Sequence, residues 1–293
     1  MDTMTQQRND KKKIIYQEGR ISALKKLLVD YKTQSKHKVE SDAITTNIIA
    51  NLIKQRDQLK GLNDAKDDFI SLASHQLRTP ATAVKQYVGM LTHGYAGELS
   101  EYQMSMLNLA YGNNERELEI IEDLLRVATV DAGKVYLEKS SCNVVQQIEA
   151  AMKEQAILFK NRGQSVVLHK PHRQIMAYID PKLILMVLEN LLDNAGKYSP
   201  TGEQVTIDVE QTDSYTNVSI KDHGVGISEG DCQKLFKKFS RIDNPLSASV
   251  KGTGLGLYWV KKVLDLHEGI IEVTSKLNEG STFKIKMPTS TAN

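Results

Sequence analysis

Residues 11–75 contain almost no glycine or proline, and this stretch constrains the fold more than any other part of the chain. Mostly apolar residues recur there at alternating steps of four and three, which keeps them on one face of a helix and favours pairing with a second helix; we call them the seam positions. The seam has two runs, which are Ile14, Gln17, Ile21, Leu24, Leu28 and Tyr31, and then Ile48, Leu52, Gln55, Leu59, Leu62, Lys66, Phe69 and Ala73. Residues 32–43 between the runs are polar, so the seam breaks there or the helix is solvated. We expect an N-terminal coiled coil between two chains; the alternative is a single helix packed on its own domain.

A helical hairpin is predicted next. The first helix should continue past Pro80, which removes one backbone hydrogen bond and bends the helix. After a turn at residues 93–97, Ser100 can cap a second helix, with Gln103 completing a capping box, and Gly133 can end it. A lone antiparallel hairpin cannot bury its apolar stripes. The sequence therefore predicts a homodimer in which two hairpins form a four-helix bundle.

The pattern changes after Gly133, where short strands alternate with helices. The predicted strands are 135–139, 166–168, 175–179, 205–210, 215–221, 270–276 and 282–287, and the predicted helices are 143–160, 181–192 and 257–266. Hairpin-like strand pairs favour a mixed sheet with helices on one face. The fold class is therefore multidomain: an all-α helical hairpin followed by an α+β two-layer sandwich.

Composition limits the function classes. The net charge of +2 gives no reason to expect a nucleic-acid partner, which would need a clustered basic excess. Cys142 and Cys232 are far apart and have no metal-ligand spacing, so we expect reduced thiols. No apolar run approaches the ~20 residues that span a bilayer, and the N-terminus lacks the apolar core of a signal peptide. We expect a cytoplasmic protein with no direct membrane span, or the cytosolic part of a longer one.

Asn190 and Asn194 lie four residues apart and project from one face of the helix predicted to begin at Pro181. An amide oxygen is a hard ligand that suits Mg²⁺, and Lys197 beyond them can supply a point charge to phosphate. The alternative is that both amides only form hydrogen bonds within the fold.

Two glycine-containing segments follow the asparagine pair. Asp222 ends a predicted strand and is followed by Gly224 and Gly226, so its carboxylate can accept from an exocyclic amine while the glycines let backbone approach a flat ring. The segment 252–257, Gly-Thr-Gly-Leu-Gly-Leu, precedes a helix whose N-terminal N–H groups can attract phosphate. Each segment alone could be an ordinary turn. The second is neither a Walker loop nor a dinucleotide fingerprint.

A histidine segment, Ser74-His75-Gln76-Leu77-Arg78-Thr79-Pro80, lies on the long helix. Taken alone, His75 is an ordinary, partly exposed bundle histidine. In their order along the chain, the histidine segment, the asparagine pair and the glycine segments resemble a sensor histidine kinase of two-component signalling. Residues 135–288 resemble the ATP-binding domain shared by histidine kinases, gyrase B, Hsp90 and MutL.

The resemblance implies ATP and Mg²⁺ as cofactors. It implies that Asn194 holds Mg²⁺ with Asn190 nearby, that Lys197 contacts phosphate, that Tyr198 lies against adenine and that Asp222 accepts from its amine. Leu235–Arg241 matches the family's phenylalanine box, so Arg241 would reach the terminal phosphate, and residues 242–251 would form a lid. The remaining nucleotide-binding positions are Gly224, Gly226, Gly252, Thr253, Gly254, Gly256 and Leu257.

The resemblance also implies catalytic roles. His75 would accept the γ-phosphoryl group and pass it to an aspartate in the receiver domain of a response regulator. Gln76 stands where the family has an acid; it can orient the imidazole but cannot ionise, which should slow autophosphorylation about ten- to thirty-fold. Arg78 would hold phosphate or pair with an acid. Thr79 would position water for dephosphorylation of the regulator, or simply bond the preceding helical turn.

The expected domains are an input helix at 1–46, a dimerisation and phosphotransfer hairpin at 47–134 and a catalytic domain at 135–293. Three alternatives remain open. The first is a family member biased to phosphatase activity by Gln76, and the second is a nucleotide-gated interaction module that signals by conformation alone. The third is a generic ATPase such as a chaperone, against which the histidine segment and the short length argue.

Overall fold

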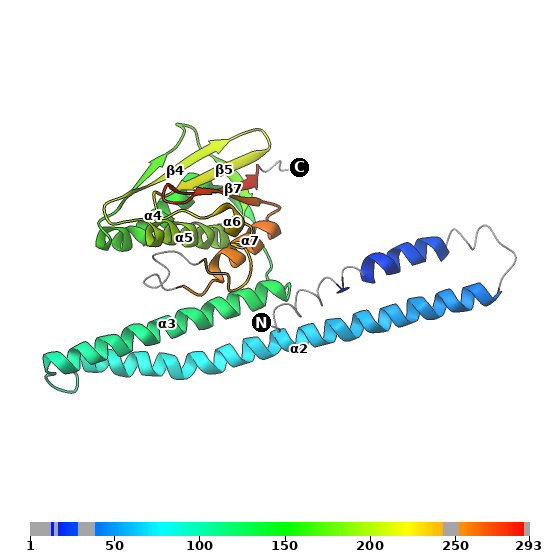
Figure 1. Ribbon diagram of the computed structural model, residues 1–293, viewed down its shortest axis with the longest axis horizontal. Helices are drawn as coiled ribbons and strands as arrows, with labels where there is room; N and C mark the ends of the chain where they lie inside the picture. Colours follow the sequence, from blue (N-terminus) through cyan, green and yellow to red (C-terminus); the bar gives the residue numbers. More distant parts are fainter. Residues whose placement is uncertain (1–12, 15–16, 29–38, 243–251, 290–293) are drawn as a thin grey trace. The chain divides into compact units, whose positions relative to one another are not determined.

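The structure, a computed structural model, describes residues 13–14, 17–28, 39–242 and 252–289 (Figure 1). The chain divides into two compact units, residues 1–73 and 74–293. The helix α2, Val39–Thr92, begins in the first unit and ends in the second.

The described residues of the first unit are helical. Residues 17–28 are helical, and the Gln17 side-chain amide donates to Oε1 of Gln55 on α2, 3.1 Å away. Both glutamines are predicted seam positions, and two other seam residues, Ile21 and Leu52, are buried. The two predicted runs therefore contribute to contacts within one chain. Of the polar stretch 32–43, residues 39–43 belong to α2, and the remainder lies outside the described residues.

The second unit begins with the predicted hairpin. Helix α2 continues past Pro80, and α3 spans Glu101–Asp131. The capping box is present: the Ser100 hydroxyl accepts from the N–H of Gln103, and the Gln103 side chain accepts from the N–H of Ser100. The Lys85 ammonium pairs with Glu115 at 2.8 Å, which joins the two antiparallel helices.

A five-stranded mixed sheet follows in the order β2-β4-β5-β7-β6. Strands β2 and β4 are parallel, and the other neighbours are antiparallel. The strands span Ser165–His169 (β2), Gln204–Gln211 (β4), Tyr215–Lys221 (β5), Ile270–Lys276 (β6) and Gly280–Pro288 (β7). The mixed sheet expected from the strand pattern is therefore confirmed.

A separate two-stranded sheet corrects one prediction. Strand β1, Ser140–Asn143, pairs with β3, Met176–Ile179, whereas residues 135–139 form no strand. The reason is tertiary: the N–H of Glu138 donates to Oδ2 of Asp180 at 2.9 Å instead of entering a strand ladder.

Three helices cover one face of the sheet (Figure 1): α4 at Val144–Asn161, α5 at Pro181–Tyr198 and α7 at Gly256–Leu266. The short α6 spans Glu229–Cys232. The core between the layers contains fully buried side chains from both: Leu188, Leu191, Leu192, Ile207, Ile220, Leu264 and Ile285. Helix α5 runs past the predicted end at Leu192, and contacts between residues four apart, Asn190 with Asn194 and Asp193 with Lys197, support the added turns.

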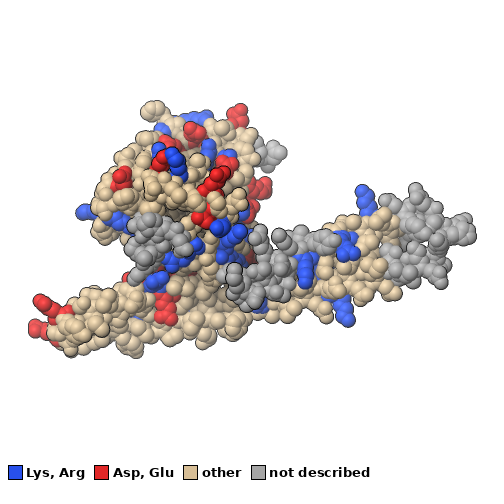
Figure 2. Space-filling model, viewed as in Figure 1, with Lys and Arg blue, Asp and Glu red and all other residues tan. Residues whose placement is uncertain are grey.

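Charged side chains of both signs are interspersed over the sheet domain on the face seen in Figure 2. Among the helices that the structure describes, none has the length and apolar character needed to cross a membrane.

Candidate functional site

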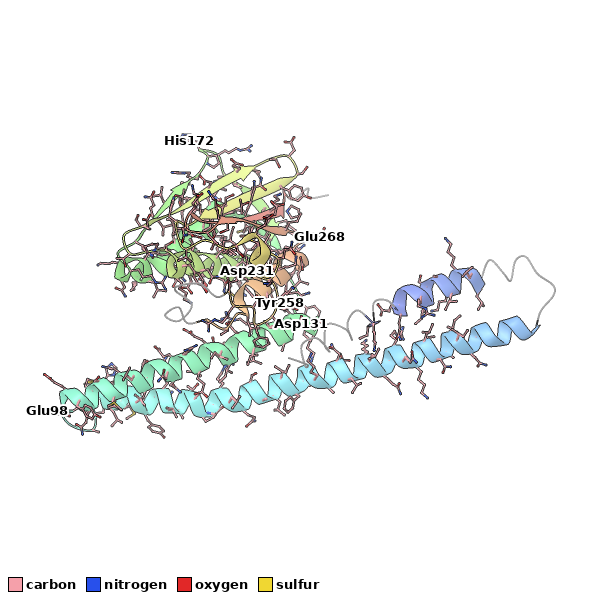
Figure 3. The ribbon with its side chains drawn as sticks, in the orientation of Figure 1. Glu98, Asp131, His172, Asp231, Tyr258 and Glu268 are labelled. Carbon is pink, nitrogen blue, oxygen red and sulfur yellow. The ribbon has the colours of Figure 1, made fainter. Side chains whose placement is uncertain are left out.

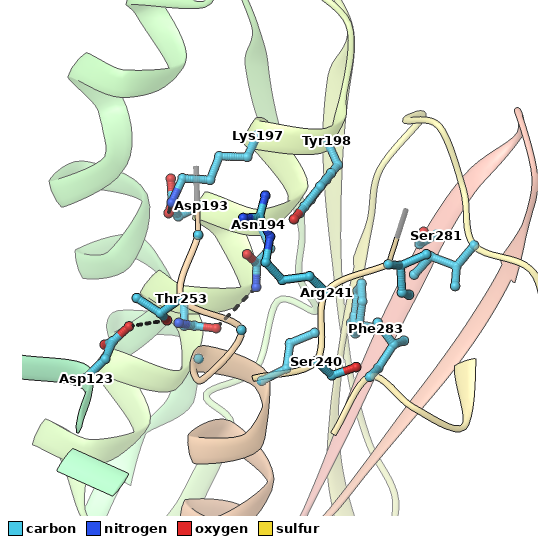
Figure 4. A pocket seen from close by; sticks show the side chains of 18 of the residues that line it. Asp123, Asp193, Asn194, Lys197, Tyr198, Ser240, Arg241, Thr253, Ser281 and Phe283 are labelled. Atoms are coloured by element: carbon cyan, nitrogen blue, oxygen red, sulfur yellow. Dashed lines mark hydrogen bonds and ion pairs between the residues drawn. The ribbon is translucent and has the colours of Figure 1, made fainter. Parts of the chain in front are cut away.

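A pocket collects the predicted nucleotide-binding residues (Figure 4). Twelve of the thirteen predicted positions line it; Gly224 does not. The lining positions are Asn190, Asn194, Lys197, Tyr198, Asp222, Gly226, Arg241, Gly252, Thr253, Gly254, Gly256 and Leu257. Segments that are separate in the sequence thus meet in one pocket at the ends of α5 and α7.

The asparagine pair lies on α5. The Asn194 amide nitrogen donates to Oδ1 of Asn190, 3.2 Å away, which is the intramolecular bond that the sequence left open as an alternative. In this orientation the contact uses the nitrogen of Asn194 and leaves its oxygen available. Asn190 also packs on the start of α7: a Cβ on Gly256 would lie 2.5 Å from Nδ2 of Asn190.

Lys197 is held by a residue that the sequence reasoning missed. Its ammonium lies 2.5 Å from Oδ2 of Asp193, and Oδ1 of Asp193 lies 3.1 Å from the Arg162 guanidinium. Asp193 therefore bridges two cations and fixes the position of Lys197 at the pocket. The spacing of four residues from Asp193 to Lys197 was the available sequence signal.

Asp222 is buried, with 4% of its surface exposed. Its Oδ1 accepts from the N–H groups of Gly224 at 2.8 Å and Ser281 at 3.1 Å. Burial raises the pKa of the Asp222 carboxyl above its usual value, and these two hydrogen bonds act in the opposite direction. Neither of these two bonds uses Oδ2, so this oxygen can accept a hydrogen bond from a ligand in the pocket.

Packing within the protein explains two of the predicted ligand-binding glycines without a ligand. A Cβ on Gly224 would lie 2.2 Å from the carbonyl oxygen of Tyr198. Gly226 has φ 66°, and a Cβ there would lie 1.9 Å from the carbonyl oxygen of Lys276. From the sequence, we expected both glycines to let the backbone approach a flat ligand ring. In the structure, each glycine instead lies against a backbone carbonyl of the protein itself.

The glycine-rich segment leads into α7, whose N-terminus has no side-chain cap. The first N–H groups of a helix lack intrahelical partners and carry a partial positive charge, which suits phosphate. The Thr253 hydroxyl accepts from the N–H of Leu255 at 3.2 Å and orders the turn before the helix. Gly254 has φ 71°, and a Cβ there would lie 2.8 Å from the backbone of Phe239.

One wall of the pocket comes from α3 and was not predicted. It consists of Arg116, Glu119, Ile120 and Asp123. Their spacing on α3 is that of an ordinary solvated helix face, so only the tertiary packing reveals them. Phe283 and Ser281 of β7 also line the pocket without having been predicted.

The histidine segment lies elsewhere on α2. His75 and Gln76 are exposed, and neither they nor Arg78 and Thr79 line the pocket. The Thr79 hydroxyl donates to the carbonyl oxygen of His75, 3.3 Å away, as the local alternative predicted. Nε of Arg78 is buried and has no hydrogen-bond partner among the described residues.

The predicted lid falls largely outside the described residues, which include only Ile242 of the range 242–251. Ile242 and Arg241 both line the pocket.

Comparisons with known proteins agree with this arrangement. Residues 65–133 match the family described as His Kinase A (phospho-acceptor) domain. Residues 179–291 match the family described as histidine kinase-, DNA gyrase B- and HSP90-like ATPase. Sensor protein SrrB of Staphylococcus aureus is 32% identical over 231 residues, which cover 78% of this chain and 39% of SrrB. The chain therefore spans less than half the length of this curated relative.

Solved structures show the same fold. Histidine kinase AdeS of Acinetobacter baumannii has a TM-score of 0.52 at 25% identity, over 74% of this chain and 98% of that one. Full-length ShkA, solved in complex with AMPPNP, has a TM-score of 0.64 at 21% identity, over 77% of this chain and 46% of that one.

Proposed function

Because this chain belongs to the sensor histidine kinases of two-component signalling, we propose that it transfers the γ-phosphoryl group of ATP to His75 and then to an aspartate of a response regulator. The observation that carries the proposal is the pocket, which gathers the predicted nucleotide-binding positions. The two family matches fall within the proposed phosphotransfer hairpin at 47–134 and the proposed catalytic domain at 135–293. Residues 1–46 would be the input segment.

In the proposed nucleotide complex, adenine lies between Tyr198 and Asp222, and Oδ2 of Asp222 accepts from its amine. The phosphates lie against the uncapped N-terminus of α7, with Lys197 and Arg241 supplying positive charge. The single available amide oxygen of Asn194 fits a Mg²⁺ ion, which binds few protein ligands and keeps water and phosphate oxygens. When bound, the ion would neutralise phosphate charge.

The chemical step needs positioning more than covalent assistance. A neutral imidazole nitrogen of His75 forms a bond to the γ-phosphorus while the bond to the leaving oxygen of ADP breaks in line. The imidazolium then loses its proton. Gln76 can accept the imidazole N–H hydrogen bond and so orient the ring, but it cannot take that proton. Since His75 does not line the pocket, the step needs either a movement of the catalytic domain relative to α2 or transfer between the two chains of the proposed homodimer.

A homodimer is part of the proposal. Large apolar side chains are exposed on both helices of the hairpin: Leu77, Val84, Tyr87, Met90, Met106 and Leu109. A second hairpin would cover them in a four-helix bundle. We place this part of the protein in the cytoplasm, where ATP and a response regulator are present.

The test is a two-stage labelling experiment. The chain is incubated with γ-labelled ATP and Mg²⁺, and purified receiver domains are then added. We expect an acid-labile, base-stable label on the chain that moves to a receiver domain. Label that resists acid would indicate a hydroxyl acceptor and would overturn the assignment of His75.

A second candidate is a kinase biased towards dephosphorylating its regulator, which the neutral Gln76 favours. Thr79 lies on the His75 face of α2, where a hydroxyl can position water. If Thr79→Ala leaves the decay of a phosphorylated receiver domain unchanged in the presence of this chain, the phosphatase role fails.

A further inference from the structure

A carboxylate from α3 reaches the glycine-rich segment. Oδ2 of Asp123 accepts a hydrogen bond from the Thr253 hydroxyl, and the two oxygens are 2.6 Å apart (Figure 4). Both residues line the pocket, and Thr253 lies just before the N-terminus of α7. The Asp123 carboxylate therefore takes up the hydrogen bond of the Thr253 hydroxyl, at the end of the pocket that is best suited to bind phosphate.

A second acid of α3 makes a similar contact outside the pocket. Oδ1 of Asp131 accepts from the Tyr258 hydroxyl at 2.7 Å (Figure 3), and its other oxygen pairs with Lys238. Burial, followed by the contact with Asp131, raises the pKa of Tyr258, so its hydroxyl stays protonated and donates. Neither Asp131, Tyr258 nor Lys238 lines the pocket. The two contacts therefore differ in position: the contact of Asp123 lies in the pocket where a ligand would bind, and the contact of Asp131 does not.

The charges around Asp123 determine what a ligand would meet. Glu119 adds a second acid from α3 to the same pocket, while Arg116 and Arg241 add positive charge. Lys197 is already paired with Asp193. A phosphate group at the N-terminus of α7 would bring negative oxygens close to Asp123, and repulsion between charges a few ångströms apart is strong in a partly desolvated pocket.

We propose that Asp123 is a specificity-determining residue whose negative charge makes binding depend on the number of phosphate groups of the nucleotide. Asp123 accepts a hydrogen bond from the Thr253 hydroxyl, and a bound triphosphate would repel the carboxylate and compete for that hydroxyl. Asp123 therefore weakens triphosphate binding selectively and has little effect on adenosine. This inference rests on the proposed function, because it assumes that the pocket binds an adenine nucleotide.

The test is the variant Asp123→Asn in the full chain. Asparagine keeps an oxygen that can accept from Thr253 but removes the charge. Equilibrium titrations with adenosine, AMP, ADP and a non-hydrolysable ATP analogue in Mg²⁺ compare it with the wild type. We expect the affinity of the variant for the triphosphate to rise about tenfold, with a smaller gain for ADP and none for adenosine.

Asp131→Asn is the matched control, because it makes the same charge change on the same helix at a contact outside the pocket. We expect it to leave the ratio of triphosphate to adenosine affinity at the wild-type value. An equal gain for all four ligands in Asp123→Asn, or no gain for the triphosphate, would overturn the inference. If the wild type binds none of the four, the proposed function itself fails, so the two failures are distinguishable.

Discussion

The imidazole of His267 accepts a hydrogen bond from the backbone N–H of Asp180, with Nε2 3.0 Å from the nitrogen. Its Nδ1 lies 2.8 Å from the carbonyl oxygen of Val263, to which it donates. Asp180 caps α5 and His267 caps the end of α7, so this buried ring joins the two helices that carry the asparagine and glycine segments. The bond from Asp180 requires an unprotonated Nε2 and hence the neutral ring, and burial lowers the pKa of His267 below its usual value.

The first prediction concerns stability against pH. Because the folded-state pKa of His267 is below the unfolded value of about 6.5, the unfolded chain binds the proton more readily. The contribution of His267 is therefore constant above about pH 6.5 and is lost as the pH falls below it. The single tryptophan, Trp259 on α7, reports urea unfolding of this domain by fluorescence.

His267→Gln supplies the control, since an amide can donate and accept but does not titrate in this range. We expect the urea midpoint of the variant to depend less on pH below about 6.5 than that of the wild type. Equal slopes in the two proteins would show that other groups cause the dependence.

The second prediction concerns adenine recognition. Asp222→Asn keeps an oxygen for Gly224 and Ser281 but replaces Oδ2 with a donor facing the pocket. Losing a buried hydrogen bond and creating a donor clash costs about 1–3 kcal/mol, so ATP affinity should fall about five- to 150-fold. Isothermal titration calorimetry measures it.

The pH dependence of the same binding is an internal check. Since burial raises the pKa of Asp222, protonation removes its acceptor as the pH falls towards that pKa, and wild-type affinity should fall with it. The asparagine variant should lose this component. Wild-type affinity that rises with acidification would contradict the assigned role of Asp222.

The third prediction uses two glycines of one segment. Gly254→Ala places a side chain at φ 71° and 2.8 Å from the backbone of Phe239, whereas a Cβ on Gly252 meets nothing within 4 Å among the described residues. We expect Gly254→Ala to destabilise the domain by about 1–2 kcal/mol and Gly252→Ala to have little effect on folding. Urea unfolding followed by Trp259 fluorescence compares the two, and equal midpoints would refute the steric argument.

The fourth prediction concerns the neighbour of the proposed acceptor. Gln76→Glu restores an anion that can stabilise the imidazolium, and autophosphorylation should become about ten- to thirtyfold faster. Initial rates of label incorporation at saturating ATP measure the effect. Gln76→Met, which removes the acceptor, should be slower than the wild type; a glutamate variant no faster than the wild type would show that the carboxylate was not the missing element.

Local chemistry explains what the sequence could predict. The Ser100 capping box and the cluster of Asn194, Asp222 and Gly254 in one pocket follow from residue types whose roles depend on near neighbours and on a family pattern. The prediction of a strand at 135–139 was wrong because the N–H of Glu138 donates to Asp180, which is distant in the sequence.

The unpredicted part of the site also depends on tertiary contacts. Asp123 reaches Thr253 across 130 positions of sequence, and nothing in the local pattern of α3 marks it. Arg162 does not line the pocket, but it pairs with Asp193, which in turn pairs with Lys197. Gly224 was singled out for the approach of a ligand ring, whereas the neighbour that the structure shows there is the Tyr198 carbonyl.

The most direct test of the central claim is label incorporation from γ-labelled ATP into three proteins: the wild type, His75→Ala and His93→Ala. His93 is a matched control, because it is also exposed on the helical hairpin and has no proposed role. We predict base-stable label in the wild type and in His93→Ala, and none in His75→Ala, with nucleotide binding unchanged in all three. Label retained by His75→Ala would contradict the assignment of His75 as the phosphoryl acceptor.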